Sequence, residues 1–356
     1  MNLLREHRVK ILISLVVAGC FVWLLNRGAL PIWPAPKPLA RFDWSTLCAY
    51  LGLWTVVHII RAVRWQLLLA PLAPVPLKKT VGVAFVGFAA VILLPLRTGE
   101  VVRPALIRQK ENLSGWSATG TVAAERIIDG LMLSVLLWFG ILAAVPMEPL
   151  PDQIGDLPIS PKLLPAATYS ALLLFTAAFT AMALFYFARE WAYRQTRATL
   201  GRIAPKLADW LAERVDRLAQ GLKFLESPRV AAPFIALTAV YWLLNAASTL
   251  LLAEGCGLAE MTYPQACVVM GVLALGVMVP NAPGFFGAFQ LAIYAALALY
   301  FPQDQLLGDG SVLVFMMYAA QLGITLSGAV VGAYLARGTS QSSNRAKDQW
   351  CARPEP

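Results

Sequence analysis

Charged residues at helical spacing follow one of the most apolar stretches of the sequence. Arg97, Glu100 and Arg103 come directly after Val81–Leu96, at intervals of three residues. A helical segment with this spacing places the glutamate between the two arginines. An unpaired charge in the middle of a bilayer costs about 3 kcal/mol. The pattern therefore predicts mutually neutralising charges at membrane depth.

A second charged cluster opens a later apolar stretch and consists of Glu125, Arg126 and Asp129. Glu125 and Asp129 are four residues apart, so a helix places them on the same face. Together the two clusters hold three arginines and three carboxylates, whose charges sum to zero. We expect them to meet and neutralise one another in a low-dielectric interior.

Arg61 and Arg64 are the remaining charges of this kind, and they stand near the end of another apolar stretch. If the two clusters neutralise each other, both arginines are surplus positive charge. Guanidinium binds phosphate bidentately, so a cavity with surplus arginine suits a phosphate-bearing headgroup. In the alternative interpretation, all eight charged residues lie near the membrane surface, and their side chains extend so that the charged ends reach water.

The composition is that of a membrane protein. Of the 356 residues, 58% are hydrophobic and 14% are charged, against roughly 25% charged in soluble domains. The formal charge of +9 fits basic loops on one side of a membrane, and we expect no nucleic-acid partner. Five cysteines at irregular spacing and two histidines predict no disulfide framework, no metal site and no cofactor.

The elements that must position these residues are apolar segments of two kinds. About six are long enough to cross a bilayer as helices, which takes roughly 20 residues each. The expected crossings are 11–30, 43–69, 117–145, 162–187, 229–253 and 311–336. The basic, then apolar N-terminus also resembles a signal peptide, but its apolar run continues past the small residues of a cleavage box, which favours an uncleaved first span.

Two further apolar regions, 80–110 and 262–301, are interrupted by proline and glycine. Proline ends a helix and glycine permits a sharp reversal. Paired interrupted helices of opposite orientation are typical of transporters with inverted repeats, so we predict two re-entrant broken helices, with two ordinary kinked spans as the alternative. The expected breaks contain Pro95, Gly99, Pro104, Pro280, Pro283 and Gly284.

The distribution of basic residues predicts the topology. Residues 146–161 contain no lysine or arginine, whereas 188–229 are rich in both, so the basic segment and both termini are expected in the cytoplasm. Apolar residues at steps of three and four predict an amphipathic helix over about 190–226, lying on anionic lipid or packed on the protein. The transmembrane domain should cover 1–338, followed by a disordered cytoplasmic tail over 339–356.

Three motifs resemble the flippase-like transmembrane domain of lysylphosphatidylglycerol synthases, over about residues 8–338. They are Pro95-Leu-Arg-Thr-Gly-Glu-Val-Val-Arg-Pro104, Glu125-Arg-Ile-Ile-Asp129 and Pro280-Asn-Ala-Pro-Gly-Phe-Phe-Gly287, joined by the element Arg61–Trp65. The resemblance implies an all-α protein of the bacterial cytoplasmic membrane, in which two re-entrant helices meet at mid-membrane and lipids move between leaflets.

The sequence departs from that family's pattern in two respects. Gln290 stands where an acid is frequent, and Phe285 replaces a usual glycine, so an ionic role for the second broken helix is not expected. These 356 residues contain no segment that we interpret as a soluble aminoacyl-transfer domain, so the synthase activity is not expected.

The interpretation that we favour is a lipid flippase that moves a phospholipid, hopanoid or glycolipid without ATP hydrolysis, since no P-loop motif is present. The alternatives are a non-catalytic membrane partner of a lipid-biosynthetic enzyme, a lipid-modifying enzyme that uses Glu100 or Glu125 as general acid/base, and a small-solute transporter. Membrane lipids are the expected partners.

Overall fold

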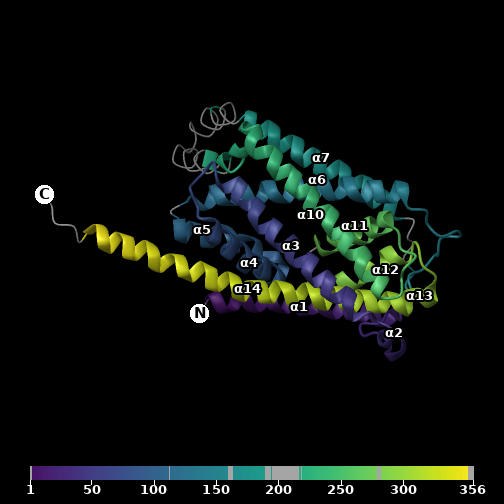
Figure 1. Ribbon diagram of the computed structural model, residues 1–356. Helices are drawn as coiled ribbons and strands as arrows, with labels where there is room; N and C mark the ends of the chain where they lie inside the picture. The colour runs from purple at the N-terminus through teal and green to yellow at the C-terminus, as the bar shows by residue number, and fades with distance from the viewer. Residues whose placement is uncertain are drawn as a thin grey trace.

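The computed structural model describes residues 2–111, 113–158, 163–188, 194, 216–217, 219–278 and 282–351 (Figure 1). These residues form helices, and the only β pairing among them is one isolated bridge between Ile154 and Leu157. The prediction of an all-α polytopic membrane protein is confirmed. Five helices in the described part are long and apolar enough to cross a membrane. They are α3 (Trp44–Leu69), α6 (Gly115–Ala143), α7 (Leu163–Phe187), α10 (Pro228–Gly255) and α14 (Asp309–Cys351).

Shorter helices complete the bundle. The first expected crossing corresponds to α1 (Asn2–Arg27), and a five-residue helix, α2 (Pro36–Ala40), joins it to α3. The remaining short elements are η2 (Lys223–Glu226) before α10 and α13 (Gln303–Leu307) before α14.

The region 80–110 forms a helical hairpin. It consists of α4 (Leu77–Leu93), the 3-10 helix η1 (Pro95–Val101) and α5 (Val102–Glu111). Helix α4 ends where it does because Leu94 precedes a proline and adopts the extended conformation that such residues prefer. A Cβ at Gly99 would lie 2.2 Å from the backbone of Ala90, and one at Gly87 would overlap the Arg103 side chain. The chain therefore turns back along α4.

The region 262–301 forms a second hairpin. It consists of α11 (Tyr263–Met278), the 3-10 turn η3 (Pro283–Phe285) and α12 (Ala288–Leu297). A Cβ at Gly276 would lie 2.7 Å from that of Ala292, so α12 runs back against α11. The 16 residues of α11 cover about 24 Å, less than the roughly 30 Å of a hydrocarbon core. Both interrupted regions thus form broken helical hairpins.

The helix contacts show an inverted repeat. The series α3, α4–α5, α6 corresponds to α10, α11–α12, α14: the first hairpin packs on α14, the second packs on α6, and α3 packs on α10. Exchanging the two halves leaves this pattern unchanged. Figure 1 places α5 and α12 toward opposite ends of the molecule, so the hairpins enter from opposite sides.

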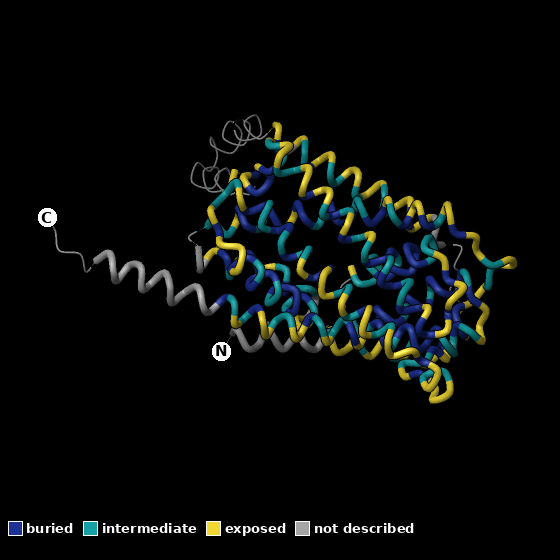
Figure 2. The backbone as a smooth tube through the Cα atoms, viewed as in Figure 1, coloured by how far each residue is buried: buried dark blue, intermediate teal, exposed yellow. Residues whose placement is uncertain are grey.

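Two hydrophobic cores hold the hairpins in place. One, with Val83, Phe88 and Ile107, surrounds the first hairpin, and the other, with Val269 and Ile293, surrounds the second. Buried segments accordingly concentrate within the bundle, as Figure 2 shows. Phe88 of the first core and Phe289 of the second line the space between the hairpins.

Small residues let α14 pack closely on the first hairpin. A Cβ at Gly332 would lie 2.7 Å from the backbone oxygen of Gly82 and from Cβ of Phe85. Such close approach of backbones at glycine is how helices associate in lipid, where hydrophobic burial contributes little.

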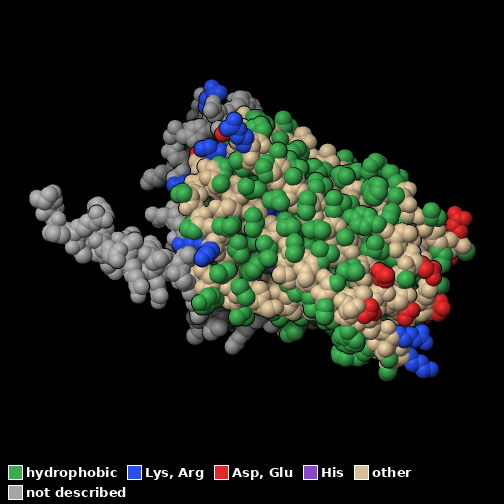
Figure 3. Space-filling model, in the orientation of Figure 1, with side chains coloured by type: hydrophobic (Ala, Val, Ile, Leu, Met, Phe, Trp, Pro, Cys, Tyr) green, Lys and Arg blue, Asp and Glu red, His purple; other side chains and the backbone are tan. Residues whose placement is uncertain are grey.

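The two ends of the bundle differ in charge. Basic side chains gather at the end where α1 begins and toward which α14 extends, and acidic side chains gather at the opposite end (Figure 3). A few basic side chains also lie at the acidic end, near α2.

Two expectations concern the polar segments. Most of the amphipathic helix expected over 190–226 lies outside the described residues, but its described end packs on the protein: Ala219 and Phe224 are fully buried, and Gly221 contacts the backbone of α6. Residues 339–351 continue helix α14, in place of the disordered tail that we expected. No proline interrupts this stretch, and helix elongation from a formed helix is favourable.

A charged cavity between the hairpins

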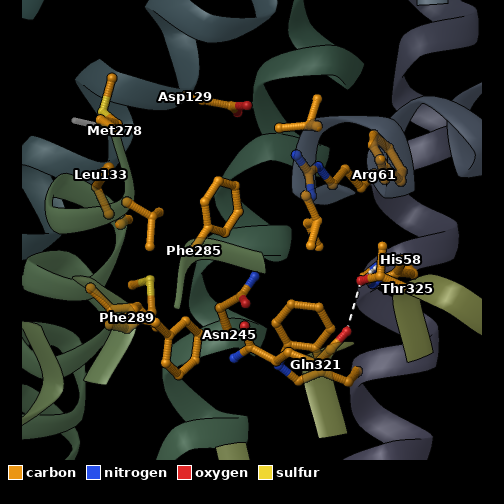
Figure 4. Close-up of a pocket in the computed structure, with 18 of the residues that line it drawn as sticks. His58, Arg61, Asp129, Leu133, Asn245, Met278, Phe285, Phe289, Gln321 and Thr325 are labelled. Carbon is orange, nitrogen blue, oxygen red and sulfur yellow. Dashed lines mark hydrogen bonds between the residues drawn. The ribbon is translucent and has the colours of Figure 1, made fainter. Parts of the chain in front are cut away.

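A cavity of ≈ 190 Å³ lies where the two hairpin tips approach each other. Helices α3, α4, α6, α10, α11, α12 and α14 all contribute to its lining. Figure 4 shows Arg61, Asp129 and Phe285 around one part of it and Asn245 and Gln321 around another. A buried water occupies about 10–15 Å³ on this measure, so the cavity has room for a polar headgroup.

Arg97 links the two hairpin tips. Its Nη1 donates to the backbone oxygen of Val277 near the end of α11, at 2.7 Å, and its guanidinium lies 5.8 Å from the centroid of the Phe285 ring. Arg97 has φ 57° and Phe285 has φ 56°. Left-handed backbone costs an ordinary residue about 1–2 kcal/mol. Each tip therefore holds a strained residue, and these two residues contact each other.

Glu100 continues the chain of ion pairs from the tip into the protein. Its Oε1 lies 3.0 Å from Nη2 of Arg97, and its Oε2 lies 3.9 Å from Nε of Arg126. The ion pair between Arg97 and Glu100 confirms the prediction from their spacing.

Glu125 lies at the centre of the buried charges, on α6. Arg103 and Arg126 each approach it to 2.8 Å, and Arg64 approaches it to 3.3 Å. Arg103 thus pairs with Glu125, so the expected placement of Glu100 between Arg97 and Arg103 is only half right. The 3-10 conformation of residues 95–101 changes the rotation per residue from that of an α-helix, and α5 then directs Arg103 at α6.

Arg64 is fully buried and paired, which corrects the prediction that it is surplus charge. Its Nη1 and Nη2 donate to the two carboxylate oxygens of Asp129 at 2.5 and 2.6 Å, and Nη1 also donates to Thr238 at 3.0 Å. Both Glu125 and Asp129 reach this one arginine, so the prediction that they share a helix face is confirmed.

Within the described part of the chain, Arg61 lacks a carboxylate partner. Its guanidinium lies 4.1 Å from the centroid of the Phe88 ring and lines the cavity, and among the described residues it has no hydrogen bond or ion pair. Across the eight charged residues, five arginines face three carboxylates. The cluster therefore carries two positive charges in excess.

The residues expected at the helix breaks occupy the hairpin turns. Pro95 begins η1, Gly99 is buried against α4, and Pro104 lies in the first turn of α5. Pro283 begins η3 and Gly284 has φ 76°, while Pro280 lies outside the described residues.

Gln290 has a structural role in the second hairpin. Its side-chain oxygen accepts the backbone N–H of Gly287 at 2.7 Å, as in the capping box at the start of a helix. An uncharged amide meets this need.

The sequence did not single out several polar and aromatic residues of the cavity. His58, whose Nε2 lies 3.2 Å from the hydroxyl of Thr325, lines it together with Trp54, Asn245 and Gln321. One signal was present: Trp54, His58 and Arg61 recur at steps of four and three, which places them on one face of α3.

The fold and site define a polytopic membrane protein in which two opposed broken-helix hairpins enclose a charged cavity. Among protein families, the profile described as the lysylphosphatidylglycerol synthase TM region matches residues 11–309. The chain belongs to this family, as the three sequence motifs indicated. Searches of curated proteins and of solved structures gave no match.

Proposed function

We propose that the protein moves a phospholipid or a related amphiphile between membrane leaflets without hydrolysing ATP. The observation that carries this proposal is the unpaired Arg61 on the wall of a cavity that lies between two opposed re-entrant hairpins. Irregular backbone at membrane depth is tolerated where it lines a wet cavity. In transporters with inverted repeats, such a position holds the substrate.

Arginine side chains on the lining bind the phosphate of the headgroup. Arg61, Arg97 and Arg126 all reach the cavity, and the side chains of Arg97 and Arg126 keep 20% and 28% of their surface exposed. Ion pairs with Glu100 and Glu125 fix the orientation of Arg97 and Arg126, which reduces the entropy lost when a phosphate binds.

The two hairpin tips gate the cavity alternately. The hydrogen bond from Arg97 to Val277 and the contact of Arg97 with Phe285 join the tips in this state. When a headgroup phosphate binds the Arg97 guanidinium, the hydrogen bond from Arg97 to Val277 breaks. One hairpin can then move away from the other. The strain at the two left-handed residues favours such a change.

The orientation in the membrane follows from charge. We propose that the basic end, from which α1 starts, faces the cytoplasm and that the membrane is the bacterial inner membrane. We also propose that the protein is not an enzyme, because Glu100, Glu125 and Asp129 all pair with arginines and so make poor general bases. A biosynthetic enzyme that supplies the lipid would be a natural partner.

Leaflet exchange in liposomes tests the proposal. Purified protein is reconstituted with tail-labelled phospholipids, and exchange is followed by quenching the outer leaflet. Arg61→Gln should slow exchange at least tenfold, whereas Arg41→Gln, which removes a positive charge from an exposed position outside the cavity, should not. Wild-type exchange no faster than that of protein-free liposomes, for any lipid tried, would reject the proposed function.

A further inference from the structure

Uncharged polar side chains form a second part of the cavity. Asn245 of α10 and Gln321 of α14 line it, and Figure 4 shows both amides away from Arg61 and Asp129. A headgroup phosphate bound at the arginines would therefore leave this part of the cavity to the substituent that the phosphate carries. The groups that the substituent would meet are set by the orientation of the two amides.

The orientation of the Asn245 amide follows from its surroundings. Its Nδ2 donates to the backbone oxygen of Tyr241 at 2.9 Å. A backbone oxygen can only accept, so the amide nitrogen must face it and Oδ1 must face the other way. Asn245 is 6% exposed, and no described residue donates to its Oδ1. This oxygen is not one of the enclosed unpaired atoms of the described residues, so a ligand in the cavity can reach it.

Gln321 presents a second acceptor to the cavity. Its Nε2 donates to the hydroxyl of Tyr50 at 3.0 Å, and no described residue donates to its Oε1. Like Oδ1 of Asn245, this oxygen is accessible from the cavity. Amide oxygens accept N–H and O–H donors, so the two acceptors favour a ligand that brings donors of its own.

A tryptophan of the cavity lining lies near each amide. Trp54 follows Tyr50, the partner of Gln321, by one turn of α3, and the two rings lie 6.4 Å apart. Trp242 is three residues before Asn245, on the same face of α10. No guanidinium of the described residues lies over either indole ring. Such rings can pack on the carbon skeleton of a polyol or on an ammonium group.

From these contacts we infer that Asn245 and Gln321 form a second subsite, which determines specificity by binding a donor-bearing substituent of the headgroup phosphate. The hydroxyls of a polyol and the ammonium group of an amine share this chemistry, since both donate to amide oxygens. A headgroup without such a donor leaves both acceptors unmet, which is costly for a buried polar group. The inference rests on the proposed function in that the occupant is taken to be a membrane lipid.

Three lipids with the same acyl chains test the subsite by binding alone. Phosphatidylethanol has no donor on its substituent, phosphatidylglycerol has a diol, and phosphatidylethanolamine has an ammonium group. Native mass spectrometry of the purified full-length protein measures the occupancy of each. We expect at least one donor-bearing lipid to bind about fivefold more tightly than phosphatidylethanol, as one additional hydrogen bond would give. The lipid that binds most tightly identifies the donor.

Removing an acceptor should remove the preference. Asn245→Leu keeps the approximate size of the side chain without its oxygen, so the affinity ratio should fall toward one while phosphatidylethanol binds as before. A purely structural role of Asn245 would change the affinity of all three lipids alike. Asn26→Leu, which removes an exposed amide outside the cavity lining, should leave the ratio unchanged. Gln321→Leu provides the same test at the second acceptor if Asn245→Leu does not fold.

Equal binding of all three lipids by the wild type, or tightest binding of phosphatidylethanol, would overturn the inference. A ratio that both Asn245→Leu and Gln321→Leu leave unchanged would do the same. So would displacement of bound lipid by free glycerol phosphate at equal concentration, because the site would then take a soluble ester. Leaflet exchange measured in parallel separates the two proposals: a binding preference without exchange rejects only the proposed function, and exchange of lipids that bind equally rejects only the second subsite.

Discussion

The pair formed by Arg64 and Asp129 allows a quantitative test of the ion-pair network. Arg64 is 0% exposed and donates two charge-assisted hydrogen bonds to Asp129, at 2.5 and 2.6 Å. Asp129→Asn removes the negative charge and leaves Arg64 with Glu125 at 3.3 Å, a carboxylate that Arg103 and Arg126 already engage. Removing one partner of a buried ion pair costs about 3–5 kcal/mol.

Removing both charges together should be much less harmful. In the double variant Arg64→Met/Asp129→Leu, Glu125 keeps two arginines, and the hydroxyl of Thr238 still donates to a backbone oxygen at 2.7 Å. Replacing a buried ion pair by apolar residues of similar size is frequently near neutral. We therefore expect the double variant to be more stable than Asp129→Asn by at least about 2 kcal/mol.

Reversible unfolding in mixed detergent micelles measures these differences as a double-mutant cycle. Arg64→Met alone and Asp129→Leu alone supply the two single-variant corners, and each should itself be strongly destabilising, because the other charge is then left without its partner. Additive losses in the double variant, or a loss below about 1 kcal/mol for Asp129→Asn, would refute the account of a buried and mutually dependent pair.

Three further predictions concern the scaffold. Gly99→Ala should abolish folding, because its Cβ would lie 2.2 Å from the backbone of α4, whereas Gly52→Ala, with nothing within 4 Å, should be tolerated; recovery of monodisperse protein distinguishes them. Gly332→Leu should lower the melting temperature by pushing α14 off the first hairpin, and Gly323→Leu in the same helix, which also has open space, should not. Asp43 accepts hydrogen bonds from the backbone N–H and the hydroxyl of Ser45, and these bonds hold the pKa of the Asp43 carboxyl below its ordinary value. The Asp43 carboxylate therefore contributes fully to stability at a pH above its ordinary, unfolded-state pKa. This contribution is lost as the pH falls through the lower folded-state pKa. The melting-temperature difference between wild type and Asp43→Asn should accordingly shrink below about pH 4.

Most of the fold could be predicted from the sequence because membranes restrict the possibilities. Long apolar segments must be helices in lipid, and the two segments interrupted by proline and glycine were too short to cross. The opposite orientation of the hairpins followed from the alternation of charge between loops. The continuation of α14 over 339–351 was missed because polar composition does not decide whether a formed helix extends.

The site was predictable only where the partners are neighbours in the sequence. Spacing gave the pair of Arg97 with Glu100 and the shared face of Glu125 and Asp129. It could not decide which arginine of α3 reaches α6, because that depends on how two distant helices pack. The contact of Arg97 with Val277 was equally inaccessible, since it depends on a left-handed residue at the tip of a hairpin.

Blocking the cavity chemically tests the central claim most directly. A single cysteine is introduced at Leu133, which lines the cavity, in a background whose five native cysteines have been replaced, and is modified with a bulky thiol reagent. Leu142, 61% exposed on the same helix, provides the control cysteine. Modification at Leu133 should stop leaflet exchange in liposomes, and modification at Leu142 should not. Undiminished exchange after complete modification at Leu133 would contradict a lipid path through this cavity.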